Sequence, residues 1–164
     1  MDRPIRKPMR LREYDYSSPG AYFITICTRE KECLLSRILV GAGVLDGPKV
    51  ELSSCGMAVE ETLRDMDRHY PRVSIDRFVI MPNHIHLLLC ISAGGPSGTP
   101  APTNAVLPSL ISYLKRTTNR KCGFPLWQRS FYDHVIRNGD DYRQIAEYIE
   151  ANPARWGEDR FYRA

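Results

Sequence analysis

The sequence predicts an α+β fold in which helices pack on one face of an antiparallel sheet. Several short apolar runs rich in β-formers have the length of strands, and segments with helical periodicity are interspersed with them. With 164 residues the chain has the length of one domain, so we expect a single domain over residues 1–164.

The first half of the chain predicts strands before a helix. After a turn signal at residues 17–20, residues 21–27 are apolar on both faces, which is typical of a central strand. Residues 38–52 predict a further strand or hairpin, with its turn at residues 47–48. A serine at position 53 or 54 can cap a helix over residues 56–70.

The second half predicts two more strands and two helices. Residues 73–81 and 84–91 have the composition of strands, and residues 108–121 have the period of a helix with proline in its first turn. A final helix begins at residue 140 or 141 and ends at Asn152, before a proline. This order of elements predicts a ferredoxin-like layout.

Charge is unevenly distributed along the chain. Of the 23 basic and 19 acidic residues, residues 1–12 hold five basic residues and one acid, so the net +4 lies in these twelve residues, which begin the predicted N-terminal arm, residues 1–16. A second basic run lies within residues 115–137. A phosphate backbone is one partner for such patches, and a solvated tail with a solvated helix face is the alternative. The candidate DNA-binding residues are Arg3, Arg6, Lys7, Arg10, Arg12, Lys115, Arg116, Arg120, Lys121 and Arg129.

Other features exclude whole classes of protein. The five cysteines include no C-x-x-C pair, so neither a structural zinc site nor a disulfide framework is expected. No apolar run approaches the ~20 residues that span a membrane, and the basic N-terminus has no apolar segment behind it. We therefore expect a cytoplasmic protein that binds no membrane.

Residues 93–105, rich in glycine and proline, predict a flexible loop that carries no catalytic or binding residues.

Two histidines interrupt an apolar strand. His84 and His86 stand at positions i and i+2, so both imidazoles point to the same face of the strand. The other face is wholly apolar and belongs to the core, so we expect the histidines to face solvent or a ligand. Two neutral imidazoles side by side can share one divalent metal ion. The alternative is a pair of half-buried histidines that form hydrogen bonds at a strand edge.

The last helix offers a tyrosine that packing does not explain. At 100° per residue, Tyr148 lies about 120° from the centre of the predicted core stripe, and Asn152 lies one turn further along the same face. The alternative is a surface tyrosine followed by a helix stop at Asn152. The predicted core stripe consists of Tyr142, Ile145, Ala146 and Ile149.

Three motifs follow one another in the order found in a known family. They are Met-Pro-Asn-His-Ile-His-Leu-Leu at residues 81–88, the aromatic and basic segment at residues 126–137, and residues 140–153 with the tyrosine helix. Together with residues 10–25 they resemble the REP-associated tyrosine transposases, within the single-tyrosine HUH transposase superfamily. The resemblance extends over nearly the whole chain, apart from the loop at 93–105 and the last ten residues.

The resemblance assigns roles to individual residues. It implies that His84 and His86 are the metal ligands of the HUH motif and that Tyr148 is the nucleophile. Asn152 stands where the family places a carboxamide as a third metal ligand, and some relatives carry glutamine there. His134 receives no catalytic role, because core packing or a DNA contact explains it as well.

The resemblance also implies an activity and its partners. A DNA transposase of this kind is a single-stranded DNA endonuclease and strand transferase that forms a 5′-phosphotyrosine intermediate in DNA transposition and recombination. It would use Mg²⁺ or Mn²⁺ without an organic cofactor, act on single-stranded or hairpin DNA, and exist as a homodimer or a monomer. One alternative is a non-catalytic DNA-binding protein of the same fold. Another is a metal-dependent hydrolase, which would need a third histidine or a carboxylate near the pair.

Overall fold

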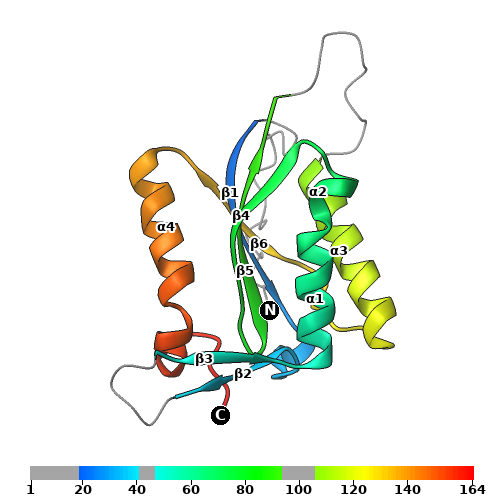
Figure 1. Cartoon of the computed structure of the whole chain (residues 1–164), viewed down its shortest axis with the longest axis vertical. Coiled ribbons are helices and arrows are strands. Elements are labelled where there is room, and N and C mark those ends of the chain that lie inside the picture. Colours follow the sequence, from blue (N-terminus) through cyan, green and yellow to red (C-terminus); the bar gives the residue numbers. More distant parts are fainter. Residues whose placement is uncertain (1–18, 41–46, 94–105) are drawn as a thin grey trace, which may run out of the picture.

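The main sheet has four antiparallel strands in the order β4-β5-β1-β6 (Figure 1). The computed structural model describes residues 19–40, 47–93 and 106–164. The predicted arm and nearly all of the predicted loop at 93–105 lie outside the described residues. The four strands are β1 (Gly20–Cys27), β4 (Val73–Ile80), β5 (His84–Ile91) and β6 (Tyr132–Ile136).

The connections between the strands give the ferredoxin-like topology. β1 and β4 are parallel because both pair antiparallel with β5, and α1 crosses between them. β5 and β6 are likewise parallel on either side of β1, with α3 as their crossover. Two strand–helix–strand units interlocked in this way place β1 and β5 at the centre of the sheet. The predicted α+β fold class is confirmed.

The helices lie on both faces of the sheet, rather than on one face as the sequence predicts. Helices α1 (Ser54–Arg64), α2 (Met66–His69) and α3 (Val106–Cys122) lie on one side, and α4 (Gly139–Ala151) lies on the other (Figure 1). The reason lies in β5, since Leu88 is fully buried on the face opposite Leu87 and Leu89. A strand that is apolar on both faces needs a cover on both.

The main core fills the space between the sheet and the helices α1 and α3. Its residues from the central strands alternate along β1 and β5, as expected for strands with one face in the core. This packing fixes the backbone of β5, and therefore also the direction of the side chains on its other face. The central residues of this core are Tyr22, Ile24, Ile26, Ile85, Leu87, Leu89, Val59, Leu63, Leu110 and Leu114.

The remaining elements match the sequence with two exceptions. The predicted hairpin is formed by β2 (Ser36–Leu39) and β3 (Lys49–Leu52), and Ser53 caps α1 by accepting a hydrogen bond from the Gly56 amide at 3.0 Å. The helix predicted over 56–70 is divided at Asp65 into α1 and α2. Strand β6 is not among the predicted strands. Two short 3₁₀ segments, η1 (Arg29–Lys31) and η2 (Pro153–Glu158), complete the described chain.

Helix α4 is fastened to the edge strand β4 by two polar contacts. The Tyr142 hydroxyl donates a hydrogen bond of 2.7 Å to Asp76 Oδ2, so the residue predicted to pack in the core also holds a carboxylate. Arg77 on β4 pairs with Glu150 near the other end of α4 at 3.1 Å. Both contacts reach neighbouring residues of β4, and they hold α4 beside this edge strand.

A third polar contact fastens α4 to the opposite edge of the sheet. His134 Nε2 on β6 lies 2.9 Å from Asp141 Oδ2 in the first turn of α4. His134 therefore has a contact within the protein, and with its side chain 40% exposed core packing does not explain it. Within α4, Ile149 is the one fully buried residue. Polar contacts at both edges of the sheet therefore help to hold the helix in place.

Replacing Tyr142 by phenylalanine should lower the free energy of unfolding by about 1 kcal/mol at neutral pH, the typical loss for one hydrogen bond. The hydrogen bond to Asp76 raises the pKa of Tyr142 to about 12, whereas an unfolded tyrosine titrates near ~10. A raised pKa stabilises the fold below the unfolded pKa, so the difference between the two proteins should shrink as pH rises from about 10 to 12. Urea unfolding at several pH values measures it. Tyr162→Phe, at an exposed tyrosine, is the control, and equal stability of Tyr142→Phe and wild type at pH 7 would contradict the prediction.

Candidate active site

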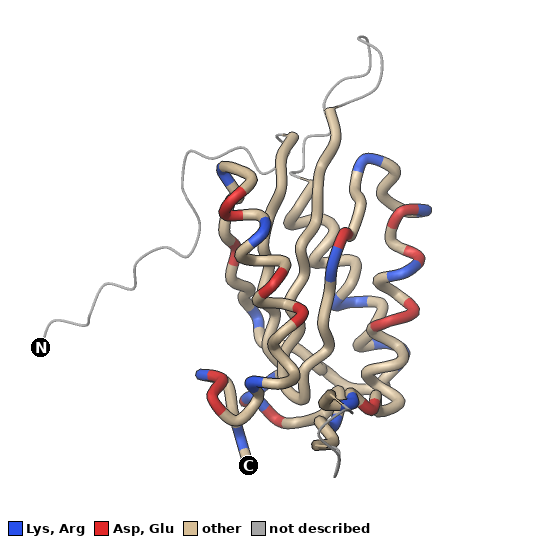
Figure 2. The backbone as a smooth tube through the Cα atoms, turned by 60° about the vertical axis from the view of Figure 1, so that its left-hand side comes forward, with Lys and Arg blue, Asp and Glu red and all other residues tan. Residues whose placement is uncertain are grey.

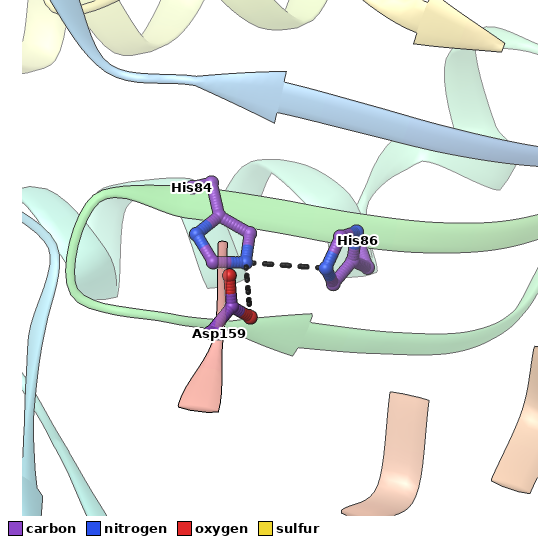
Figure 3. Close-up of side chains that lie close together, drawn as sticks. All are labelled: His84, His86 and Asp159. Carbon is purple, nitrogen blue, oxygen red and sulfur yellow. Dashed lines mark hydrogen bonds and ion pairs between the residues drawn. The ribbon is translucent and has the colours of Figure 1, made fainter. Parts of the chain in front are cut away.

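His84 and His86 lie on the face of β5 that α4 covers. Their Nε2 atoms are 3.1 Å apart and face each other (Figure 3). The side chains are 0% and 2% exposed, because α4 and the C-terminal segment cover them. Trp156 and Phe161 both contact the His84 ring, with centroid distances of 6.0 Å and 4.7 Å. Of the two environments predicted for this face, solvent or a ligand, the structure excludes solvent, since an apolar cover follows later in the chain.

The Nδ1 atoms of both histidines are held by neighbouring polar side chains. Asn83 Oδ1 lies 2.9 Å from His84 Nδ1, and Thr25 Oγ1 lies 2.8 Å from His86 Nδ1. The Asn83 amide nitrogen donates to the Phe161 carbonyl at 2.7 Å, so its oxygen is the acceptor and His84 Nδ1 must donate. This leaves a lone pair on His84 Nε2. Partners of this kind orient imidazoles that bind metals.

Burial keeps both imidazoles neutral. It lowers the pKa of His84 to about 4, against an opposing effect of the Asp159 carboxylate. Burial also lowers the pKa of His86 well below its usual value, and the neighbouring His84 adds to this. Metal ions bind the neutral form of imidazole, so both rings are in the state that binds a metal at neutral pH.

Asp159 brings a carboxylate to the two histidines. Its Oδ2 lies 3.7 Å from His84 Nε2, and its side chain is 3% exposed (Figure 3). One ligand atom from each of Asp159, His84 and His86 lies within 4.8 Å of the others. Asp159 follows η2 directly, so the chain returns to β5 after α4 to place it here.

This group of side chains fits a divalent cation. Two ligands at right angles around an ion with bonds of about 2.1 Å lie about 3 Å apart, close to the separation of the two Nε2 atoms. Among the described residues, the buried oxygens Asp159 Oδ2 and Asn152 Oδ1 have no hydrogen-bond partner. A buried oxygen without a hydrogen-bond partner destabilises the folded protein unless a ligand binds it, and a cation beside the two imidazoles would bind both oxygens.

Asn152 lies at the C-terminal end of α4, where its side chain reaches both His84 and Tyr148. Its amide raises the pKa of His84 and lowers that of Tyr148, in each case as a smaller effect than burial. The side chain is 3% exposed. The predicted third ligand is thus brought to the histidines, together with Asp159 as a second oxygen donor.

Tyr148 lies against the histidine pair from the α4 side. Its ring meets the His86 ring edge-on with centroids 5.3 Å apart, and it also contacts Phe23. The tyrosine is 43% exposed, and an open pocket of about 310 Å³ lies beside it. Burial and the Asp159 charge raise the pKa of Tyr148, so the phenol is protonated at neutral pH. The pocket is lined by Gln144, Glu147, Tyr148, Ala151, Asn152 and Arg155.

The basic residues predicted to bind DNA are dispersed. Lys115 donates hydrogen bonds to the carbonyl groups of residues 128–130, and Lys121 pairs with Glu61 at 2.9 Å, so both have partners within the protein. Arg116, Arg120 and Arg129 are exposed. Figure 2 shows acidic residues interspersed with basic ones along the described helices. The five basic residues of the arm lie outside the described residues.

Sequence reasoning missed three residues of this site. Asp159 is one of many surface-type acids and stands outside every motif. Thr25 reaches His86 because β1 and β5 pair in the register that places these two residues opposite each other. Asn83 reads as a turn residue, whereas its amide holds both His84 and the C-terminal segment. A cross-strand alignment of the polar positions in residues 21–27 and 84–91 was the one signal that could have found Thr25.

Comparisons with known proteins give three informative similarities, although no family model matches the chain. A Haemophilus influenzae protein, described as uncharacterized, is 34% identical over 96% of this chain and 93% of its own length. A REP-associated tyrosine transposase of Escherichia coli is 30% identical over 84 residues, which are 51% of this chain and 46% of that protein.

The third similarity is to a solved structure of a REP-associated tyrosine transposase bound to a REP hairpin. The TM-score is 0.62 at 24% identity, over 90% of this chain and 74% of the other. This similarity is one of fold. Among the described residues, none of the helices has the length and apolar character needed to cross a membrane.

Proposed function

We propose that the chain belongs to the REP-associated tyrosine transposases, which it resembles in sequence and fold, and that it cleaves and rejoins single-stranded DNA with Tyr148 as nucleophile. The observation that carries this proposal is the contact between Tyr148 and the paired imidazoles. The centroid of the Tyr148 ring lies 5.3 Å from that of His86, one of the two facing histidines, so the phenol lies beside a site suited to a cation.

Tyr148 would attack the phosphorus of a phosphodiester in line with the bond to the 3′ oxygen. The bond to the 3′ oxygen breaks, the 3′ oxygen takes up a proton and leaves as a hydroxyl, and the phenol loses its proton as the 5′-phosphotyrosine bond forms. This bond keeps the energy of the original linkage, so another 3′-hydroxyl can attack it and release Tyr148. The reaction needs no ATP and no organic cofactor.

The neighbours of Tyr148 determine how readily it reacts. Its phenol is protonated at neutral pH, so attack requires that the developing negative charge be stabilised. Burial and Asp159 raise the pKa of Tyr148, and the smaller opposing effects of Asn152 and Arg160 favour the charged form that the attack creates. The 43% exposure of Tyr148 leaves room for a DNA strand to approach.

His84, His86 and Asp159 would hold a divalent ion such as Mg²⁺ or Mn²⁺, with Asn152 as a further oxygen donor. When bound, such an ion supplies positive charge to a non-bridging phosphate oxygen. The residues fit this role because the imidazoles are neutral and two buried oxygens beside them lack partners among the described residues.

The substrate we propose is a single strand next to a DNA hairpin. A related transposase has been solved with a REP hairpin, which supports hairpin DNA as a partner here. A single strand can also place its backbone against Tyr148 without the second strand in the way.

One alternative gains support from a specific observation. A metal-dependent hydrolase needs a carboxylate near the histidine pair, and Asp159 supplies it. In that reaction water attacks the phosphate, and no bond to the protein forms. The two functions therefore differ in whether cleaved DNA remains attached to the protein.

A denaturing gel distinguishes them. Purified protein is incubated with Mn²⁺ and end-labelled hairpin DNA from the flanks of its own gene, with a single-stranded extension. We expect a labelled adduct that survives detergent and is absent when EDTA is added. Metal-dependent cleavage with no adduct would favour the hydrolase, and binding with neither product would favour a non-catalytic DNA-binding protein.

A further inference from the structure

Arg160 lies next to the site without an acidic partner. Its guanidinium is 4.6 Å from the centre of the Phe161 ring and 6.0 Å from the centre of the Tyr132 ring. No carboxylate within the described part of the chain forms an ion pair with it. The adjacent Asp159 directs its Oδ2 toward His84 instead (Figure 3). The charge of Arg160 is thus available to an anion.

Tyr132 stands on the same face of the sheet as the histidine pair. In β1, Thr25 pairs with His86 on one side and with Tyr132 on the other, so the three side chains form a row across three strands. Thr25 is buried and forms a hydrogen bond with His86, whereas Tyr132 is 45% exposed at the edge of the sheet. The row therefore leads from the candidate metal ligands to an exposed aromatic ring.

Phe161 links Arg160 to the histidine pair. The ring that lies under the Arg160 guanidinium also contacts the His84 ring, with centroids 4.7 Å apart. Arg160 therefore lies one aromatic ring away from the candidate metal ligands. Its own charge therefore favours a DNA backbone at this place.

We propose that Arg160 and Tyr132 form a binding subsite for the nucleotide adjacent to the scissile phosphate. The guanidinium binds a backbone phosphate, and the phenol ring packs against the base. The subsite rests on the proposed function, since it assumes that a single DNA strand passes Tyr148. Guanidinium groups bind phosphate oxygens in pairs, and exposed aromatic rings stack on bases of any sequence.

Binding without catalysis tests this subsite. Affinity for the labelled hairpin with its single-stranded extension, and for oligothymidylate, is measured in EDTA at several salt concentrations. We expect Arg160→Ala to weaken binding about tenfold and to reduce the salt slope by about 0.7, the value for one phosphate contact on a single strand. Arg160→Lys should restore most of the salt slope. The control is Arg163→Ala, which removes an exposed arginine from the same segment.

An abasic scan tests the role of Tyr132. Single bases of the extension are removed in turn, and the affinities of wild type and Tyr132→Ala are compared. The wild type should lose affinity at one position, by roughly five- to fiftyfold for one stacked base, and Tyr132→Ala should lose none there. Tyr132→Phe should behave as the wild type, because the ring is retained.

The outcomes separate this subsite from the proposed chemistry. Wild-type affinity and salt slope in Arg160→Ala, or no binding of either DNA by the wild type, would overturn the subsite whether or not an adduct forms. Loss of affinity and salt slope in Arg160→Ala, together with the abasic effect, supports the subsite even where no adduct forms. In that second case the proposed chemistry fails and the subsite remains.

Discussion

Replacing Tyr148 by phenylalanine is expected to abolish the covalent protein–DNA adduct. The substitution removes the one oxygen that forms the new bond, and it keeps the ring that contacts His86 and Phe23. We expect cleavage to fall by at least about 10³-fold, as when other enzymes lose their nucleophile. Affinity for the hairpin DNA should stay within about twofold of the wild type, because the phenol oxygen adds little to a contact made by the ring.

Adduct formation and DNA affinity both have to be measured for the Tyr148→Phe variant. The adduct is measured on a denaturing gel, and affinity is measured with the same labelled DNA in EDTA. Tyr162→Phe is the matched control, since it removes a hydroxyl from another exposed tyrosine near the site and should leave the adduct unchanged. Full adduct formation by Tyr148→Phe would exclude Tyr148 as nucleophile.

Replacing either His84 or His86 by alanine is expected to remove the response of the protein to Mn²⁺. The two Nε2 atoms face each other at 3.1 Å, so the loss of either ring removes half of the imidazole pair. In the wild type, Mn²⁺ at a hundredfold excess over its dissociation constant should add about 2.7 kcal/mol to the free energy of unfolding. Thermal unfolding with and without Mn²⁺ measures the effect.

The variants should show no such gain, and DNA cleavage should be lost with it. His69→Ala is the control, because His69 is exposed on α2 and contacts Tyr113 on the other face of the sheet. A variant of His84 or His86 that is stabilised by Mn²⁺ as strongly as the wild type would place the metal elsewhere.

The same measurement ranks the two oxygen donors. Asp159 carries a negative charge and lies 3.7 Å from His84 Nε2, whereas the Asn152 amide is neutral. We expect Asp159→Asn to weaken Mn²⁺ binding at least tenfold, and Asn152→Ala to weaken it less. The reverse order would return the third-ligand role to Asn152, as the family resemblance implies.

Local patterns in the sequence were sufficient for the fold class and for the faces on which the candidate site residues lie, whereas the proposed roles of ligand and nucleophile came from the family resemblance. The alternation of His84 and His86 with apolar neighbours correctly placed both imidazoles on one face of a strand. The spacing of Tyr148 and Asn152 correctly placed them on one face of a helix. Both conclusions depend on the period of a single element, which the sequence expresses directly.

Features that depend on pairing between distant segments could not be predicted. Strand β6 is half-exposed and carries Asp133 and His134, so it lacks the apolar pattern of a strand and forms because it completes the sheet beside β1. The helical periodicity of residues 139–151 does not predict which face of the sheet α4 covers. Asp159 reaches the site through an irregular segment. The Lys115 ammonium group donates hydrogen bonds to carbonyl groups that come 13 to 15 residues later, and the sequence gives no sign of these contacts.

The manner in which α4 is held divides the site into a rigid part and an adjustable part. The histidines belong to β5, whose backbone is packed into the core, and Tyr148 belongs to a helix with one fully buried residue. Local opening of such a helix requires less free energy than unfolding of the sheet. The amide hydrogens of α4 should therefore exchange faster than those of β5. If Tyr148 acts as the proposed nucleophile, this freedom would let it move away from the site with DNA attached, without disturbing the proposed metal ligands.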